Sequence, residues 1–271
     1  MRYGSTTYVS ICRRYYHHST HKHFLYLINR FLWSKKVFKI RSNGNVEMGK
    51  IILNSKNLIK SYQNGDKRLV VLNGINIELE TGTIITIVGE SGSGKSTLLN
   101  VLSLLDKFDS GKLLFENEDI GSLNEKKLSL FRNEKIGFIF QFHHLLPDFT
   151  VLDNLLMPLW IKNGFGQYER PLGLLSDFGL LKIKDKYPAE ISGGERQRVA
   201  IIRSIVNKPK ILFADEPSGN LDEKNSVKLI DLFKRINRDY NVTIMLTTHN
   251  PCIAKVGNKV YELKSGVLIK K

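Results

Sequence analysis

A short run rich in glycine and serine carries residue types that bind phosphate. In chain order its members are Gly89, Glu90, Ser91, Gly92, Ser93, Gly94, Lys95 and Ser96, with Thr97 next. Glycines let backbone amides turn inward on phosphate oxygens, the lysine ammonium neutralises the β- and γ-phosphates, and the Ser96 hydroxyl is a magnesium ligand. The run follows an apolar stretch at 84–88 and precedes helical spacing, which is the context that a phosphate loop requires. A glycine-rich turn that binds nothing would not need this context.

A second candidate is the acidic pair Asp215 and Glu216, which follows the apolar run 211–214. An aspartate at the end of a buried strand beside a phosphate loop can hold magnesium through water, and the adjacent glutamate can orient and polarise an attacking water. An Asp-Glu pair at a strand end is also common in a solvated loop. The pair gains weight from the motifs around it.

A third candidate is the start of a helix. Ser192, Gly193 and Gly194 precede the helix-like run 198–206. A serine and two glycines at a helix N-terminus suit an anion. One nucleotide does not need two such sites from one chain.

The apolar pattern that must position these residues changes along the chain. From 151 to about 206 it is mostly helical, and the runs 211–214 and 243–247 flank a helical stretch at 226–236, which is the strand–helix–strand spacing of a parallel sheet. Earlier runs of strand type follow Met48, at 51–53, 69–72, 75–79, 84–88, 113–115 and 136–140. The sequence therefore predicts an α/β domain.

Along the chain the phosphate loop comes first, then the Ser192 segment and the acidic pair, and residues 218–222 and His249 follow. In this order the chain resembles the ATP-binding cassette ATPases over about residues 49–271. The resemblance implies ATP as the nucleotide and an α/β fold with a RecA-like phosphate-loop core, a small antiparallel β subdomain and an α-helical signature subdomain. The ATPase domain would span 48–271, with the helical subdomain at about 142–200 inserted in the core. It also implies a head-to-tail homodimer, in which each ATP lies between the phosphate loop of one subunit and the Ser192 segment of the other.

The same resemblance assigns roles to single side chains. It implies that Tyr62 stacks on adenine, that Gln141 contacts magnesium and links the core to the helical lobe, and that His249 contacts the γ-phosphate. A surface tyrosine and a structural histidine are the plain alternatives. The implied catalytic residues are Glu216, His249 and Gln141; the implied Mg²⁺ ligands are Ser96, Gln141 and Asp215; Asp222 joins the nucleotide-binding set.

The segment 140–151, with Asn154 and 157–159 after it, resembles the ATPases of lipoprotein-releasing complexes. Related macrolide-exporter and cell-division ATPases share part of this pattern. The resemblance implies a peripheral subunit on the cytoplasmic face of the bacterial inner membrane that energises two separate transmembrane permease subunits, while the lipoprotein never touches this chain. Four apolar residues could form a groove for a permease helix or simply belong to the core of the helical lobe. They are Phe142, Leu145, Leu146 and Phe149.

The net charge of +15 raises nucleic acid as a partner, but residues 1–46 hold nine basic and no acidic residues, which leaves +6 for 47–271. Chromosome-structure ATPases carry a long coiled coil between the phosphate loop and the signature, and about a hundred residues leave no room for one. Translation-factor cassette proteins carry two cassettes, whereas this chain has one. We therefore expect no nucleic-acid partner, although a nucleic-acid module driven by the basic segment stays an alternative. Two cysteines predict neither a disulfide framework nor a cysteine metal site.

Residues 1–47 form a basic N-terminal extension that we expect to be disordered or not part of the mature protein. The acid-free composition ends where the cassette begins, so Met48 is a candidate start of the functional chain. Two alternatives remain. A basic, acid-free segment with an amphipathic stretch at 24–32 also fits an organellar presequence or a membrane-surface anchor.

Overall fold

The computed structural model describes residues 49–218 and 223–271. The N-terminal extension predicted at 1–47, and Asp222 of the nucleotide-binding set, therefore lie outside the described residues. Within these ranges no helix is long and apolar enough to cross a membrane.

A six-stranded sheet with the order β10-β9-β3-β8-β7-β6 forms the centre of the domain. Its strands are β3 (Ile84–Val88), β6 (Ile136–Ile139), β7 (Ile211–Asp215), β8 (Thr243–Thr247), β9 (Lys259–Lys264) and β10 (Val267–Lys270). Neighbours from β6 to β9 pair in parallel, and β10 pairs antiparallel to β9. The inner strands β3, β7 and β8 are mostly apolar and buried because both faces of the sheet are covered.

A second sheet has four antiparallel strands in the order β2-β1-β4-β5. They are β1 (Ile51–Asn64), β2 (Lys67–Glu80), β4 (Ser110–Phe115) and β5 (Glu118–Asp119). The apolar runs predicted separately at 69–72 and 75–79 belong to one strand, β2. Gly74 interrupts the apolar pattern with a φ of 71°, and the pairing with β1 shifts register nearby, so the strand continues through a bulge.

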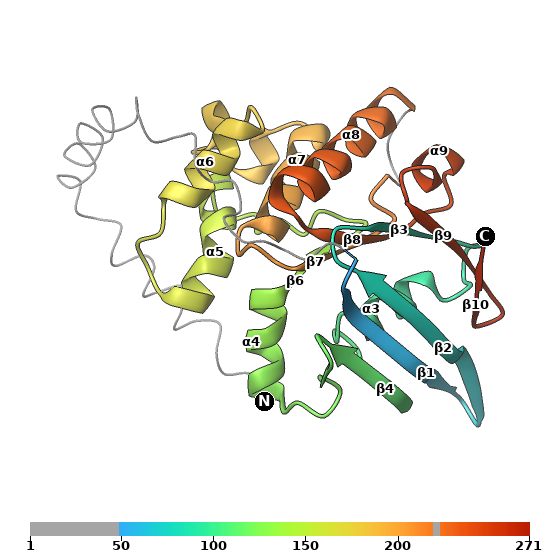
Figure 1. The fold of residues 1–271 in the computed structure, drawn as a ribbon. Coiled ribbons are helices and arrows are strands. Elements are labelled where there is room, and N and C mark those ends of the chain that lie inside the picture. Colours follow the sequence, from blue (N-terminus) through green and yellow to red (C-terminus); the bar gives the residue numbers. More distant parts are fainter. Residues whose placement is uncertain (1–48, 219–222) are drawn as a thin grey trace. The chain divides into compact units, whose positions relative to one another are not determined.

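The helices divide between the two faces of the six-stranded sheet. They are α3 (Lys95–Leu102), α4 (Glu125–Lys135), α5 (Val151–Asn163), α6 (Glu169–Asp177), α7 (Gly193–Ile205), α8 (Glu223–Tyr240) and α9 (Pro251–Ala254), with 3₁₀ turns η1 (Leu181–Ile183) and η2 (Pro188–Glu190). Figure 1 shows α6, α7 and α8 on one side of this sheet, and α3 with the antiparallel sheet on the other.

Alternation along β7 explains how one sheet supports both layers. Leu212 and Ala214 pack with α5, α6, α7 and α8, whereas Ile211 and Phe213 pack with α3 and the antiparallel sheet. Two apolar cores therefore meet at the central strands. Functional residues gather at the carboxyl ends of the strands in parallel sheets, and the segment 89–94 and Asp215 lie at these ends of β3 and β7.

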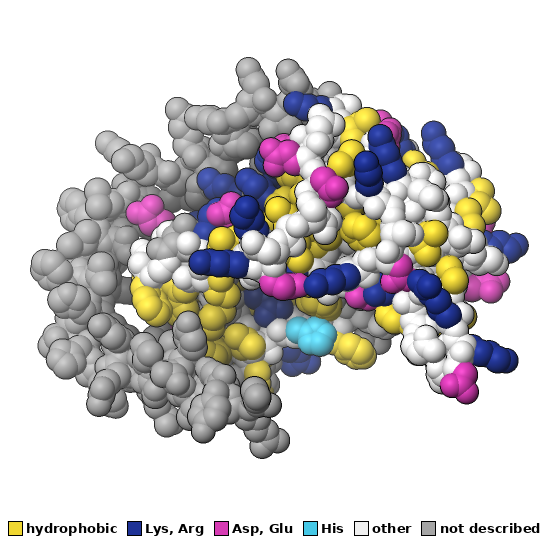
Figure 2. Space-filling model, turned by 90° about the horizontal axis from the view of Figure 1, so that it is seen from below, with side chains coloured by type: hydrophobic (Ala, Val, Ile, Leu, Met, Phe, Trp, Pro, Cys, Tyr) yellow, Lys and Arg dark blue, Asp and Glu magenta, His cyan; other side chains and the backbone are white. Residues whose placement is uncertain are grey.

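Figure 2 shows the face of the domain seen from below. On this face Lys and Arg side chains lie interspersed with Asp and Glu side chains. A nucleic-acid footprint is a continuous basic patch or stripe, and this mixed face is not one. The nucleic-acid alternative rests on the basic segment 1–46, which lies outside the described residues.

Candidate functional site

The phosphate loop joins β3 to α3, and its backbone requires glycine at several positions. Gly92 and Gly94 have φ angles of 79° and 99°, in the region that disfavours side chains. A Cβ at Gly89 would lie 2.6 Å from the Leu263 carbonyl oxygen, and one at Gly94 would lie 2.9 Å from Val71. Gly94 gives α3 no side-chain cap, so the amides of the first turn have no competing side-chain acceptor there. This loop fits a phosphate chain.

Two side chains inside the loop fit the same ligand. The Lys95 Nζ donates hydrogen bonds to the carbonyl oxygens of Gly89 (3.0 Å) and Glu90 (2.9 Å), and the residue is buried. The Ser93 Oγ is buried with no hydrogen-bond partner among the described residues. A buried hydroxyl without a partner is costly, and a phosphate oxygen would satisfy it.

The acidic pair lies at the carboxyl end of β7, beside the phosphate loop. One carboxylate oxygen of Glu216 lies 3.4 Å from the Lys95 Nζ, and the other lies 2.8 Å from the Nδ1 of His249. Thr247 at the end of β8 completes the arrangement, because its Oγ1 donates to Asp215 (2.7 Å) and accepts from the Glu216 amide (3.1 Å). The structure thus brings three predicted residues, Lys95, Glu216 and His249, into one cluster.

The accessibility of this cluster suits a reaction at its surface. The Glu216 side chain is 19% exposed and that of His249 is 62% exposed. Partial burial strengthens the interaction of a carboxylate with its charged neighbours, while the exposed histidine side chain can be reached by a ligand from solvent.

The three predicted magnesium ligands come from separate elements. Ser96 is in the first turn of α3, Gln141 follows β6, and Asp215 ends β7. Among the described residues, no group of three or more His, Cys, Asp or Glu side chains could hold a metal ion. This donor set fits Mg²⁺, which keeps several waters and takes few protein ligands beside substrate phosphates.

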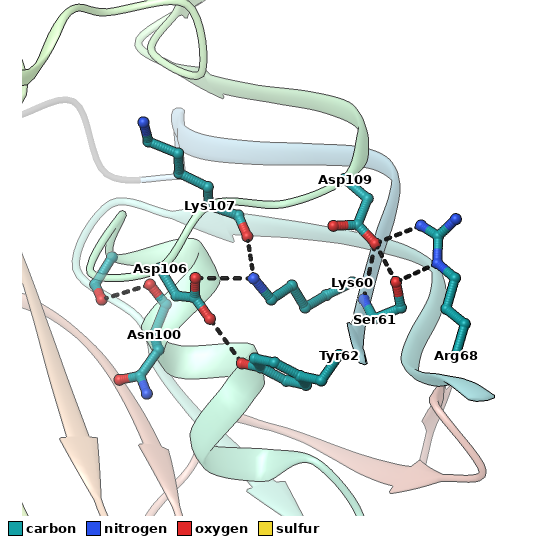
Figure 3. Close-up of polar contacts among 9 residues, drawn as sticks. Lys60, Ser61, Tyr62, Arg68, Asn100, Asp106, Lys107 and Asp109 are labelled. Carbon is teal, nitrogen blue, oxygen red and sulfur yellow. Dashed lines mark hydrogen bonds and ion pairs between the residues drawn. The ribbon is translucent and has the colours of Figure 1, made fainter. Parts of the chain in front are cut away.

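Tyr62 lies near the end of β1 and is 41% exposed. Its hydroxyl donates a hydrogen bond of 2.6 Å to Asp106 (Figure 3). Burial and the Asp106 carboxylate raise the pKa of Tyr62, against a smaller lowering by a hydrogen bond with Thr97. The ring is therefore held at its hydroxyl end, and part of it is open to solvent.

The predicted helix start is the N-terminus of α7. Ser192 caps this helix, with its Oγ and its amide both donating to the Glu195 carboxylate at 2.7 and 2.8 Å. Ser192 and Gly193 are exposed on the chain itself. Further along the helix, the buried Gln197 donates to the Pro217 carbonyl oxygen at 2.5 Å. A direct contact therefore links the helix to the segment that carries Glu216.

Sequence reasoning assigned no role to several residues that shape the site. Thr247 ends the apolar run 243–247 and Gln197 directly precedes the helix-like run 198–206, whereas Lys60 and Asp106 lie in no motif. Lys60 could have been noticed because it is two residues before Tyr62 and so lies on the same face of a strand. Asp106 offers no such local signal.

Comparisons with known proteins identify the family. A family model described as ABC transporter matches residues 72–219. The lipoprotein-releasing system ATP-binding protein LolD of Wigglesworthia glossinidia brevipalpis is 45% identical over 223 residues, which cover 82% of this chain and 97% of that protein. The LolD protein of Blochmanniella floridana is 44% identical over 229 residues, with 83% and 97% covered.

The fold has solved counterparts. A dimeric post-hydrolysis structure of the ATP-binding cassette MJ0796, bound to ADP and Pi, has a TM-score of 0.75 and 33% sequence identity, and the match covers 81% of this chain and 98% of that chain. The predicted fold class and the predicted family are both confirmed. The chain belongs to the ABC transporter family and, within it, to the ATP-binding proteins of lipoprotein-releasing systems.

Proposed function

We propose that this chain hydrolyses ATP, with Mg²⁺, to power the release of lipoproteins from the bacterial inner membrane toward the outer membrane. The observation that carries the proposal is the cluster of Lys95, Glu216 and His249 beside a loop shaped for phosphate. The family membership and the identity of about 44% to LolD proteins over most of the chain support the choice of cargo.

In this mechanism the phosphate loop and Lys95 hold the β- and γ-phosphates. Glu216 orients a water and accepts its proton as the water oxygen bonds to the γ-phosphorus and the bond to the bridging oxygen of ADP breaks. His249, hydrogen-bonded to the same carboxylate, contacts the γ-phosphate. Ser96, Gln141 and, through water, Asp215 would hold Mg²⁺, which neutralises charge on the phosphate oxygens.

The working unit in this proposal is a homodimer of ATPase subunits with two membrane permease subunits, on the cytoplasmic face of the inner membrane. The exposed N-terminus of α7 supports the dimer, because it is an anion site apart from the phosphate loop of the same chain. The MJ0796 cassette is described as dimeric. A pull-down from detergent-solubilised membranes tests the permease: a lipoprotein-releasing permease should co-purify. A macrolide-exporter or cell-division permease would overturn the cargo and keep the ATPase.

A groove of about 320 Å³ between β6, α5 and α7 supports a docking surface for the permease. Phe140, Leu146 and Ile161 contribute exposed apolar area to it. Of the four residues expected to form either a groove or a core, Leu146 lines the groove and Leu145 packs against the core. Phe142, on the same loop as Leu146, is 65% exposed outside the groove lining, and Phe149 is partly buried and belongs to neither set.

The loop that carries these residues is fastened to the signature helix. Arg203 of α7 donates to the carbonyl oxygens of His143 (2.9 Å) and His144 (2.7 Å). The fully buried Asn154 accepts from the Leu146 amide at 2.8 Å and donates back to the Leu146 carbonyl oxygen at 3.1 Å. A permease helix that displaced this loop would therefore pull on α7, whose N-terminus is the proposed second face of the ATP site.

Replacing Phe142 by Asp should abolish permease stimulation of ATP hydrolysis and leave the basal rate of the isolated ATPase within about twofold, because surface substitutions away from packed groups are nearly neutral for the fold. Rates measured with and without the reconstituted permease test this. Leu145→Asp is the contrasting variant, since a buried charge should lower the melting temperature and both rates together. Equal loss of both rates in Phe142→Asp would reject the docking surface.

Replacing Lys95 by Ala should weaken ATP binding at least about tenfold, because a charge-assisted hydrogen bond contributes about 1.5–3 kcal/mol. Titration calorimetry with ATP measures the loss. Lys56→Ala, which removes an exposed lysine from β1, is the matched control and should bind ATP normally. Unchanged affinity in Lys95→Ala would contradict the nucleotide site.

A further inference from the structure

The exposed ring of Tyr62 is fixed by two charged residues that no part of the proposed reaction uses. Asp106 accepts hydrogen bonds on both carboxylate oxygens, from the Tyr62 hydroxyl at 2.6 Å and from the Lys60 Nζ at 2.8 Å (Figure 3). The Lys60 Nζ also donates to the Lys107 carbonyl oxygen at 2.7 Å. Each of these bonds involves a charged group and is stronger than a bond between neutral groups.

Lys60 also contacts the ring itself. Because Lys60 and Tyr62 are two residues apart on β1, their side chains lie on the same face of the strand. The Lys60 Nζ lies 4.7 Å from the centre of the Tyr62 ring, in cation–π contact, and the residue is only 8% exposed. One face of the ring is therefore covered by a buried ammonium, and the exposed area of Tyr62 lies on the rest of the ring.

The same contacts connect Tyr62 to the helix that begins at the phosphate loop. Asp106 follows α3, and its amide donates to the carbonyl oxygen of Asn100 in that helix at 3.1 Å. Thr97, in the first turn of α3, is close enough to the Tyr62 hydroxyl to lower its pKa. The hydroxyl end of the ring is thus held by Asp106, which is itself hydrogen-bonded to α3, and lies beside the first turn of that helix. The position of the ring relative to the phosphate loop is set by these contacts.

We propose that Lys60 and Asp106 are positioning residues for the nucleotide base, which hold the Tyr62 ring so that its open face receives the adenine of an ATP bound at the phosphate loop. This rests on the proposed function, because it assumes ATP in that loop. Adenine stacks on the ring opposite the Lys60 ammonium. Neither Lys60 nor Asp106 needs to touch the nucleotide.

A neighbouring cluster provides the matched control. Asp109 accepts from the Ser61 amide at 2.9 Å and forms an ion pair with Arg68 at 2.8 Å. Ser61 alternates with Lys60 and Tyr62 along β1, so its side chain lies on the other face of the strand. Like Asp106→Asn, Asp109→Asn replaces a carboxylate by an amide beside the hairpin of β1 and β2. It removes no hydrogen bond to Tyr62.

The test uses three variants of the full chain, Asp106→Asn, Lys60→Met and Tyr62→Phe. Two ligands are compared: ADP, which carries adenine, and inorganic tripolyphosphate, which does not. ADP affinity should fall about fivefold to tenfold, which is the range that an aromatic stacking contact contributes to binding. Inhibition of ATP hydrolysis by inorganic tripolyphosphate should be unchanged. KM for ATP should rise while kcat stays nearly constant, as expected when uniform binding is lost. Tyr62→Phe keeps the ring and should show the same pattern, and Asp109→Asn should match the unmodified chain.

Two results would overturn the proposal. One is ADP affinity in Asp106→Asn and Lys60→Met equal to that of Asp109→Asn. The other is tripolyphosphate binding weakened as much as ADP binding, which would place the damage in the phosphate loop. Failure of the proposed function is distinguishable, because a chain that binds ADP but does not hydrolyse ATP would lack turnover in every variant and in the unmodified protein.

Discussion

Replacing Glu216 by Gln is expected to slow ATP turnover by roughly a hundredfold or more while ATP binding stays intact, because an amide cannot accept the proton of the attacking water as a carboxylate does. The structure adds a reason for intact binding. The Glu216 carboxylate lies 3.4 Å from the Lys95 Nζ, so removing its charge frees Lys95 to interact with the phosphates alone. The glutamine oxygen can still accept a hydrogen bond from His249, which keeps the cluster in place.

Single-turnover hydrolysis and ATP binding, measured on the same Glu216→Gln sample, check this prediction. Size-exclusion chromatography should show an ATP-bound dimer that persists. Glu118→Gln, an exposed residue on β5, should hydrolyse ATP at the unmodified rate. Near-normal turnover in Glu216→Gln would remove Glu216 from the catalytic role.

The parts of the fold that could be predicted are those encoded by continuous local patterns. The predicted strand 243–247 matches β8 in both bounds, since both faces of that strand are buried and three apolar β-sheet residues stand between two threonines. The phosphate loop lies between β3 and α3, as the sequence predicts, because its glycines, lysine and serine are neighbours in the chain. The buried strand and the phosphate loop could therefore be predicted, because each is specified by neighbouring residues.

Two helices are longer than the range over which their apolar residues show helical spacing. The helix expected at 226–236 spans Glu223–Tyr240, because its ends are polar turns that continue the backbone hydrogen bonding without apolar spacing. The helix expected from residue 198 begins at Gly193, where Ser192 and Glu195 form a capping box. Two glycines favour a loop, and the reciprocal cap outweighs that preference.

Contacts between distant segments could not be predicted from local patterns. Asp106 contacts a residue 44 positions earlier, and Arg203 contacts carbonyl oxygens 59 and 60 positions earlier. Sequence motifs name the groups that touch a ligand, whereas the residues that hold those groups in place are recognised only when the chain is folded. For this reason Tyr62 was proposed from the sequence and its two supporting residues were not.

The remaining prediction tests whether ATP sites are shared between subunits. A dimer that pairs one Lys95→Ala chain with one Ser192→Arg chain should contain one site damaged on both faces and one intact site. Each homodimeric variant should contain two damaged sites, because Lys95→Ala removes the charge that faces the phosphates and Ser192→Arg replaces the cap of α7 with a bulky side chain at the exposed helix start. The mixed dimer should therefore bind one ATP per dimer with nearly normal affinity.

Differently tagged chains, co-purified through both tags, give the mixed dimer, and nucleotide retained after rapid gel filtration counts its sites. Loss of the α7 cap costs about 1 kcal/mol of helix stability, so each variant also needs a melting temperature to show that it is folded. Ser192→Asn, which keeps a capping side chain, is the matched control and should lose far less binding than Ser192→Arg. If folded mixed dimers retain no more ATP than the two homodimers, the phosphate loop and the N-terminus of α7 do not share a nucleotide, and the head-to-tail arrangement is wrong.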